Sequence, residues 1–266
     1  MIIDAHVHLS LYEGNANSLE ECRDVLLGEM RQNGVDQAIV IPDNRDDQST
    51  IAGLETARRL IRDSDPLFLL GSPDVLTGGT DEVDCYEALL EDGTIHGLKF
   101  FPGHEAYYPT DARCVPFFAA CEQLNLPVVF HTGANSGDPK AARYNDPEYF
   151  RDLAERYPSL NIVITHYFWP RIQEGYEITR DVPNIHFEIA AMANPGVIRA
   201  SGGIGLVRDT LARTIDDRPT QVMFGSDWPM CRIQDHLDLL KALSLDPAIQ
   251  QMVLGRNAAN LYRLPI

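Results

Sequence analysis

The chain has 266 residues, of which 44% are hydrophobic and 23% are charged, and its formal net charge is −17. This length can bury a sizeable core, and we predict that residues 1–266 form a single domain. Because so acidic a surface repels nucleic acids and anionic membranes, neither is expected as a partner.

Short apolar runs and longer amphipathic segments alternate along the chain. The apolar runs predict strands at residues 1–8, 35–42, 67–70, 95–101, 127–130, 161–165, 185–189 and 221–224. The amphipathic segments predict helices at residues 18–33, 49–62, 81–90, 113–124, 146–157, 171–179, 204–214, 235–242 and 246–254, and a last turn at 257–262.

This order of elements determines the predicted fold class. Alternating β and α units imply a parallel sheet, and eight strands in this length imply an α/β protein with a closed (β/α)8 TIM barrel. A doubly wound open sheet is the alternative. The glycine fingerprint of a dinucleotide-binding sheet is missing after the first strand, which favours the barrel.

The five cysteines are odd in number and include no Cys-x-x-Cys pair. This pattern argues against a disulfide framework and against a thiolate zinc site. The sequence shows no charged leader before a hydrophobic segment and no apolar run that is long enough to cross a bilayer. We therefore expect a soluble cytoplasmic protein.

The first predicted strand ends in His6 and His8, which are separated by one residue. Since side chains alternate along a strand, both imidazoles point to the same face and can converge on one divalent ion. A polar alternation at a strand end without any metal would have the same spacing. The pair alone does not decide between the two.

Metal-ligand residue types recur where other predicted strands end. The fifth strand ends at His131, the sixth at His166, and the eighth leads into Asp227. In a barrel, the carboxyl ends of the strands meet at one rim, where active sites are assembled. His6, His8, His131 and Asp227 would together suffice to hold Zn²⁺ or a similar ion.

The segments around these residues resemble the amidohydrolase superfamily. The likeness lies in Asp-Ala-His-Val-His at 4–8, Val-Val-Phe-His-Thr-Gly at 128–133, Ile-Val-Ile-Thr-His at 162–166, Phe-Gly-Ser-Asp-Trp-Pro at 224–229 and Leu-Gly-Arg-Asn-Ala-Ala-Asn-Leu-Tyr at 254–262. They are most similar to the amidohydrolase-related branch, which contains aminocarboxymuconate-semialdehyde decarboxylase, resorcylate-type decarboxylases and pyrone-dicarboxylate lactonases.

This resemblance implies roles for the rim residues. His6, His8, His131 and Asp227 would bind one divalent ion, with zinc as the leading candidate. Such an ion lowers the pKa of water toward about 7. Asp227 would carry the water's proton to the leaving group, and His166 would orient the water, stabilise charge on a substrate oxygen or bind a second ion.

Other residues are candidates for contact with substrate. Lys99 lies in the fourth predicted strand, where it could bind a carboxylate as a cation, bridge a second ion as a carbamate, or extend to solvent with no role. His104 and Arg232 follow the fourth and eighth strands and are predicted to bind substrate. Glu188, near the end of the seventh, is a candidate acid or hydrogen-bond partner that strand alternation would otherwise bury.

The leading hypothesis is a metal-dependent hydrolase that cleaves a C–N or C–O bond of a small carboxylated substrate. One alternative is a non-oxidative decarboxylase of a small aromatic or unsaturated carboxylic acid. A metal-free lactonase and a non-catalytic binding barrel are the others. The number of subunits stays open, with a homo-oligomer among the options.

Overall fold

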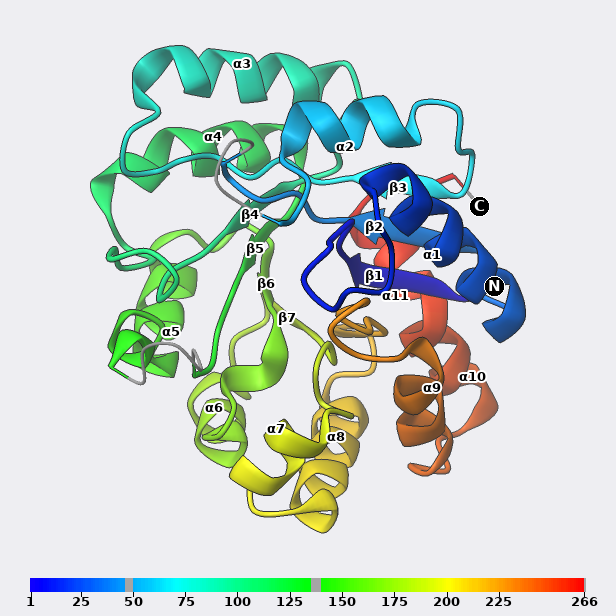
Figure 1. The fold of residues 1–266 in the computed structure, drawn as a ribbon. Helices are drawn as coiled ribbons and strands as arrows, with labels where there is room; N and C mark the ends of the chain where they lie inside the picture. Colours follow the sequence, from blue (N-terminus) through cyan, green and yellow to red (C-terminus); the bar gives the residue numbers. More distant parts are fainter. Residues whose placement is uncertain (46–49, 135–139, 266) are drawn as a thin grey trace.

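The computed structural model describes residues 1–45, 50–134 and 140–265 (Figure 1). Within them, the strands are β1 (Ile3–Val7), β2 (Gln37–Val40), β3 (Leu67–Leu69), β4 (Leu98–Phe100), β5 (Val128–Phe130), β6 (Ile162–Ile164), β7 (Ile185–Glu188) and β8 (Val222–Met223). Each lies inside a predicted strand, so the predicted order of eight strands is confirmed.

The helices surround these strands. They are α1 (Leu19–Asn33), α2 (Leu54–Ile61), α3 (Gly79–Glu91), α4 (Val115–Leu124), α5 (Pro147–Arg156), α6 (Ile172–Thr179), α7 (Pro195–Ala200), α8 (Ile204–Asp217), α9 (Ile233–Lys241), α10 (Pro247–Gln251) and α11 (Asn257–Leu261). Short 3-10 turns are η1 (Ala112–Cys114), η2 (Ala141–Tyr144) and η3 (His166–Phe168), and η4 (Met252–Arg256) is a π-helix.

Two helix predictions need correction, and one observed helix was not predicted. The sequence indicated one helix at 246–254, but this segment is α10 followed by the π-helix η4. Helix α7 was not predicted at all. The predicted helix at 49–62 begins only at Leu54, and its first predicted residue, Ser49, lies outside the described residues.

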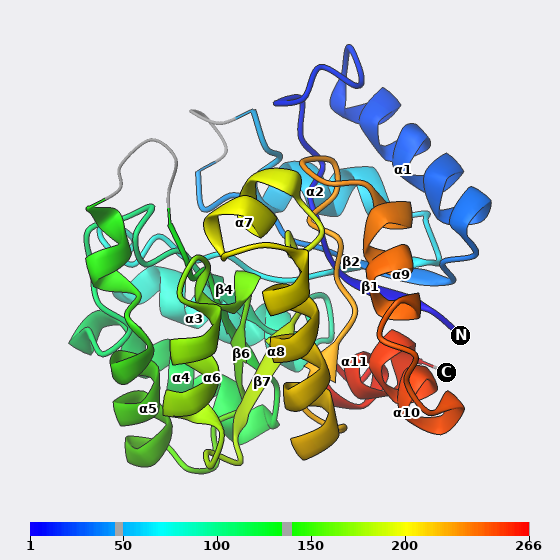
Figure 2. The ribbon, with the colours of Figure 1, turned by 90° about the horizontal axis from the view of Figure 1, so that it is seen from below.

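Hydrogen bonds join the strands into a closed ring. The ladders form two parallel sheets, β1-β2-β3 and β4-β5-β6-β7-β8. At one junction, the Ala5 amide donates to the Phe224 carbonyl (3.0 Å) and the Asp227 amide donates to the His6 carbonyl (2.9 Å). At the other, the Lys99 amide donates to the Gly71 carbonyl (2.7 Å). The predicted (β/α)8 barrel is thus confirmed, with the helices outside it (Figures 1 and 2).

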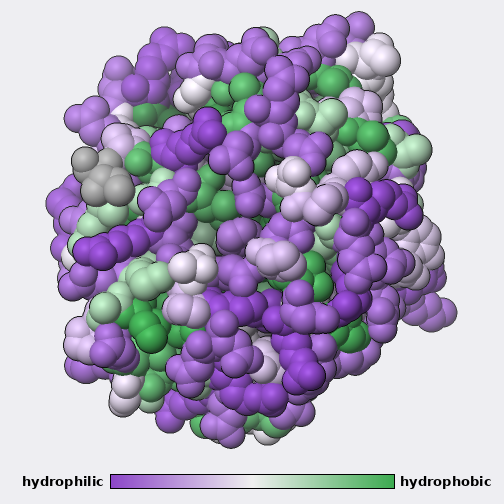
Figure 3. All heavy atoms as spheres, turned by 180° about the vertical axis from the view of Figure 1, so that it is seen from behind, coloured by the Kyte–Doolittle hydropathy of each residue, from purple (hydrophilic) through white to green (hydrophobic). Residues whose placement is uncertain are grey.

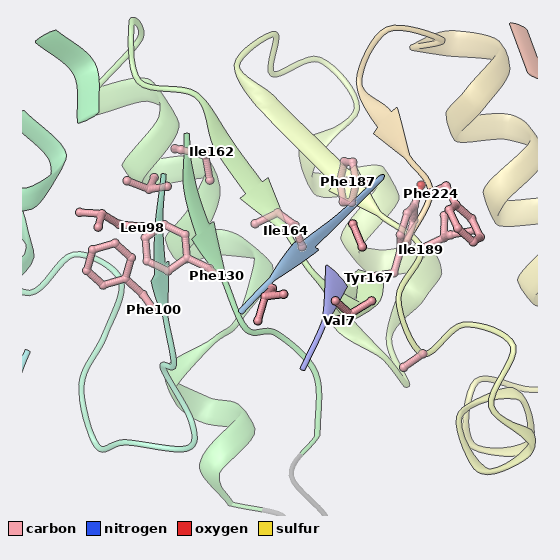
Figure 4. Packing of buried hydrophobic residues seen from close by; sticks show 14 of the residues in the cluster. Val7, Leu98, Phe100, Phe130, Ile162, Ile164, Tyr167, Phe187, Ile189 and Phe224 are labelled. Carbon is pink, nitrogen blue, oxygen red and sulfur yellow. The ribbon is translucent and has the colours of Figure 1, made fainter. Parts of the chain in front are cut away.

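Strand alternation separates two layers of apolar side chains. The larger cluster packs between strands and helices and includes Phe100 and Phe130, whose ring centroids lie 5.2 Å apart (Figure 4). Such aromatic pairs add about 0.5–1.5 kcal/mol beyond area burial. The smaller cluster fills the barrel interior and includes Val129 and Val163. Lys99 pairs in register with Val129, so its side chain also enters the interior.

A bulge in β1 changes the direction of its last residues. Asp4 pairs with Ala38 and Val7 pairs with Val40, so Ala5 and His6 together oppose the single residue Ile39. An extra residue of this kind bends a strand and redirects its side chains. It brings His6 to the interior side at the rim.

The face of the molecule in Figure 3 is mainly polar, with smaller hydrophobic areas between the polar side chains. None of the described helices is both long and apolar enough to cross a membrane.

Candidate active site at the barrel rim

A cavity of about 990 Å³ opens at the carboxyl ends of the strands. The predicted site residues that line it are His6, His8, Lys99, His104, His131, His166 and Asp227. Residues that are up to 221 positions apart in the sequence therefore share one wall because the ring of strands closes.

Three of these residues form the group that best suits a metal ion. The Nε2 atoms of His6 and His8 lie 3.1 Å apart, and each is 3.5 Å from Oδ1 of Asp227. Their ligand atoms all lie within 4.8 Å of one another, and this is the one such group of three or more in the described residues.

Hydrogen bonds determine which imidazole nitrogens are free to bind. His8 Nδ1 donates to the Ile41 carbonyl (2.8 Å), and His166 Nδ1 donates to the Ala190 carbonyl (3.2 Å). The Glu188 carboxyl accepts from His6 Nδ1 at 2.6 Å. Because each Nδ1 carries the proton, each Nε2 presents a lone pair, as metal ligation requires. The lone pairs of His6 and His8 converge beside a carboxylate oxygen, which fits a divalent cation.

His131 does not belong to this group of three. Its ring stacks edge-on against His166, with centroids 4.9 Å apart, and against His104, at 4.1 Å. The His131 Nε2 atom is buried and has no hydrogen-bond partner among the described residues. A buried nitrogen without a partner is unfavourable, and a bound cation would satisfy it.

Burial keeps three of the imidazoles in the cavity wall neutral. Burial lowers the pKa of His166 to about 3 and lowers the pKa of His6 and His131 well below the usual value. Although burial alone would raise the pKa of the Asp227 carboxyl, the neighbouring imidazoles of His166, His8 and His6 hold it well below its usual range. The site thus offers the neutral imidazoles of His6, His131 and His166 and an ionised carboxylate at neutral pH.

Lys99 contributes a buried cation to this wall. Its Nζ atom donates to the Thr165 hydroxyl at 3.3 Å and lies 5.5 Å from the centroid of the Phe101 ring. Burial lowers its pKa to about 8, and Glu188 and Asp227 oppose that shift. Lys99 is therefore mostly protonated at neutral pH, which suits binding of an anion.

Glu188 is fully buried and faces His6 rather than the helices. Burial raises its pKa to about 7, and Lys99 opposes the shift. A carboxylate that orients a ligating histidine is a recurring feature of metal sites. The sequence had suggested a hydrogen-bonding role for Glu188 without indicating His6 as its partner.

Arg232 lies apart from the other predicted substrate-binding residues. Its side chain is 76% exposed, and its guanidinium is 3.9 Å from Asp235. It is not among the described residues that line the cavity. Arg232 directly precedes α9, and its side chain extends along that helix instead of turning toward the rim.

The backbone at the rim is strained at several non-glycine residues. His166, Tyr167 and Phe168 have φ values of 59°, 57° and 58°, and Asp227 has a φ of 69°. Left-handed conformations of this kind cost on the order of 1–3 kcal/mol per residue and cluster at functional sites. Nothing in the residue types of 166–168 had indicated this turn.

Comparison with known proteins identifies the family. The family model described as Amidohydrolase matches residues 3–264. An L-fucono-1,5-lactonase from Burkholderia ambifaria is 27% identical over 135 residues, or 42% of this chain. The match spans only 44% of the length of that relative.

Solved structures with the same fold cover nearly all of the chain. An uncharacterized TIM-barrel protein from Bordetella bronchiseptica has a TM-score of 0.75 and 21% identity, with 99% of this chain and 98% of that chain covered. A putative 2-pyrone-4,6-dicarboxylic acid hydrolase from Pseudomonas putida has a TM-score of 0.72 and 15% identity, with 100% and 98% covered. A 2,6-dihydroxybenzoate decarboxylase from Rhizobium has a TM-score of 0.64 and 16% identity, with 99% and 98% covered.

Proposed function

The chain belongs to the amidohydrolase family, and on this premise we propose that it is a metal-dependent hydrolase that opens the ester C–O bond of a small carboxylated lactone. The observation that carries the proposal is the convergence of the His6 and His8 Nε2 lone pairs on the Asp227 carboxylate. The lactonase relative and the pyrone hydrolase neighbour support a lactone as the substrate.

His6, His8 and Asp227 would hold the ion, and His131 would complete the set with its unpartnered Nε2 atom. A divalent ion at this position supplies positive charge that acidifies water and polarises a carbonyl oxygen. Zinc is our proposed occupant because imidazole and carboxylate ligands suit it.

The side chains at the site have separate roles in the reaction. Asp227 accepts a proton from the attacking water and returns it to the ring oxygen as the C–O bond breaks, which yields a hydroxy acid. His166 presents Nε2 as an acceptor because its Nδ1 proton is held by Ala190, so it orients the water rather than donating to an oxyanion. Lys99 and His104, which line the same cavity, bind the substrate carboxylate.

One substitution and a matched control test the role of Asp227. Asp227→Asn should reduce kcat by about 10²–10⁴-fold, because general acid–base catalysis contributes that much. Asp235→Asn, at an exposed position on α9, is the matched control and should leave kcat unchanged. Full activity of Asp227→Asn would refute the assignment.

The Lys99→Met variant should raise KM for carboxylated lactones by about 10–100-fold, since a hydrogen bond to a charged group contributes about 1.5–3 kcal/mol. Its KM for an uncharged aldonolactone should change little. Equal effects on both substrates would contradict a role in carboxylate binding.

The reaction class itself is tested with purified protein on a panel of aldonolactones, pyrone dicarboxylates and aromatic acids. Lactone opening is followed by acid release, and metal content by mass spectrometry before and after chelation. We expect ester hydrolysis that stops on chelation and returns with Zn²⁺ or Mn²⁺. Release of CO₂ from an aromatic acid, without lactone opening, would instead establish the decarboxylase alternative.

A further inference from the structure

Three consecutive residues after β6, none of which is glycine, adopt a left-handed turn. The turn, η3, covers His166–Phe168, and His166 and Trp169 at its two ends both line the cavity. L-residues avoid this conformation because Cβ crowds the following carbonyl oxygen. Contacts from elsewhere in the fold must therefore hold the turn in place.

The hydroxyl of Thr132 makes two of these contacts. It donates to the Thr165 carbonyl at 2.5 Å and accepts from the Phe168 amide at 3.0 Å. One hydroxyl thus joins the residue before the turn to the last residue within it. Thr132 and Thr165 are completely buried and Phe168 nearly so, so water cannot replace this hydroxyl at either backbone group.

The residues after Thr132 hold the same segment. The Ala134 amide donates to the Trp169 carbonyl at 2.9 Å. A Cβ atom on Gly133 would lie 2.5 Å from a ring carbon of Trp169, so only glycine allows this approach. The His-Thr-Gly run after β5 therefore packs its backbone directly against the segment after β6.

We propose that Thr132 is a positioning residue whose hydroxyl holds the turn at 166–168, so that His166 faces the metal-ligand group and Trp169 forms the cavity wall. Its catalytic consequence rests on the proposed function. The structural part does not, because the hydrogen bonds concern residues of this chain alone.

The test compares Thr132→Val, which removes the hydroxyl but keeps the shape, with Thr132→Ser, which keeps the hydroxyl. Thr179→Val is the matched control, because Thr179 is also fully buried and its hydroxyl donates within α6, to the Gly175 carbonyl. Should Thr132→Val not fold, Thr132→Ala replaces it in the comparison with serine.

Two readouts need no substrate. The chain has two tryptophans, and Trp228 is buried, so acrylamide quenching of fluorescence reports mainly on Trp169, as Trp169→Phe verifies. Imidazole ¹⁵N shifts, assigned with His166→Gln, report on His166. We expect Thr132→Val to raise quenching about twofold and to shift the His166 signals, since a released segment exposes more of its side chains.

Turnover provides the third readout. In Thr132→Val, kcat should fall by about tenfold or more with a smaller change in KM, because misplacement by about 1 Å is enough for large losses. Thr132→Ser and Thr179→Val should resemble the wild type in all three readouts.

Unchanged quenching and unchanged His166 signals in Thr132→Val would overturn the proposal, as would a serine variant that behaves like valine. Changed signals with kcat unaltered on an active substrate would overturn the positioning role. If no lactone is turned over by the wild type but the signals change as expected, the proposed function fails and the structural role of Thr132 stands.

Discussion

We expect His186 to make the barrel sensitive to acid at the end opposite the cavity. It is the second residue of β7, pairs in register with Val163, and lines a second hollow of about 710 Å³ at the amino ends of the strands. Burial, with a smaller contribution from Arg218, lowers its pKa from 6.5 to about 4. The unfolded chain therefore binds more protons than the folded chain between these two values.

The sign and size of the effect follow from this difference. A depressed pKa in the folded state gives stability that is present above pH 6.5 and is lost as the pH falls toward about 4. Since each pKa unit corresponds to about 1.36 kcal/mol, the free energy of unfolding should fall by about 2.5 kcal/mol between about pH 7.5 and about pH 4.5 from this residue alone. His186→Gln should remove that portion of the decline.

The assay is urea unfolding of the wild type and His186→Gln at closely spaced pH values, with a chelator present so that metal binding does not vary. The difference between the two proteins in the slope of unfolding free energy against pH separates the contribution of His186 from that of the other histidines. Thr179→Val carries no titratable group and should give a curve parallel to the wild type. If the curve of His186→Gln also stays parallel through the acid range, the reasoning from burial is wrong.

Two further substitutions act on the site and its support. Glu188→Gln should weaken metal affinity by about 10–100-fold, because it removes the carboxylate that orients a ligand histidine. Competition with a chelator measures this affinity. Glu82 is a half-buried carboxylate on α3, and the control variant Glu82→Gln should bind metal as the wild type does. Gly133→Ala should lower the free energy of unfolding by about 2 kcal/mol or more, because its φ of 95° and its contact with Trp169 exclude a side chain. Gly205→Ala meets no atom within 4 Å and should be neutral or stabilising, so equal effects would contradict the steric argument.

The strands could be predicted because each is a short apolar run with a turn signal on either side. The observed strands are shorter than the predicted runs, since only the residues that pair in a ladder with a neighbouring strand belong to a strand. Helix α7 escaped prediction because six residues are too few to show an amphipathic repeat. Its signals were only Asn194 as cap and Pro195 at the first position.

The site was predictable to the level of the rim and no further. The strand ends indicated that His6, His8 and Asp227 lie near one another, but the bulge in β1 that directs His6 depends on pairing with β2. The separate position of His131 and the outward direction of Arg232 likewise follow from tertiary packing. The left-handed turn at 166–168 contains no glycine, and the Thr132 hydroxyl that bonds to both of its sides comes from the segment after β5.

The junction between β8 and β1 joins segments that lie far apart along the polypeptide, and the group of three ligands spans it. His6 and His8 lie in and just after β1, whereas Asp227 follows β8 and is synthesised last of the three. An ion bound at this junction would stabilise the closed ring over any form in which its first strand has separated from its last, because the separated form lacks part of the ligand set. A growing chain therefore cannot assemble this ligand group until β8 has been made and packs beside β1.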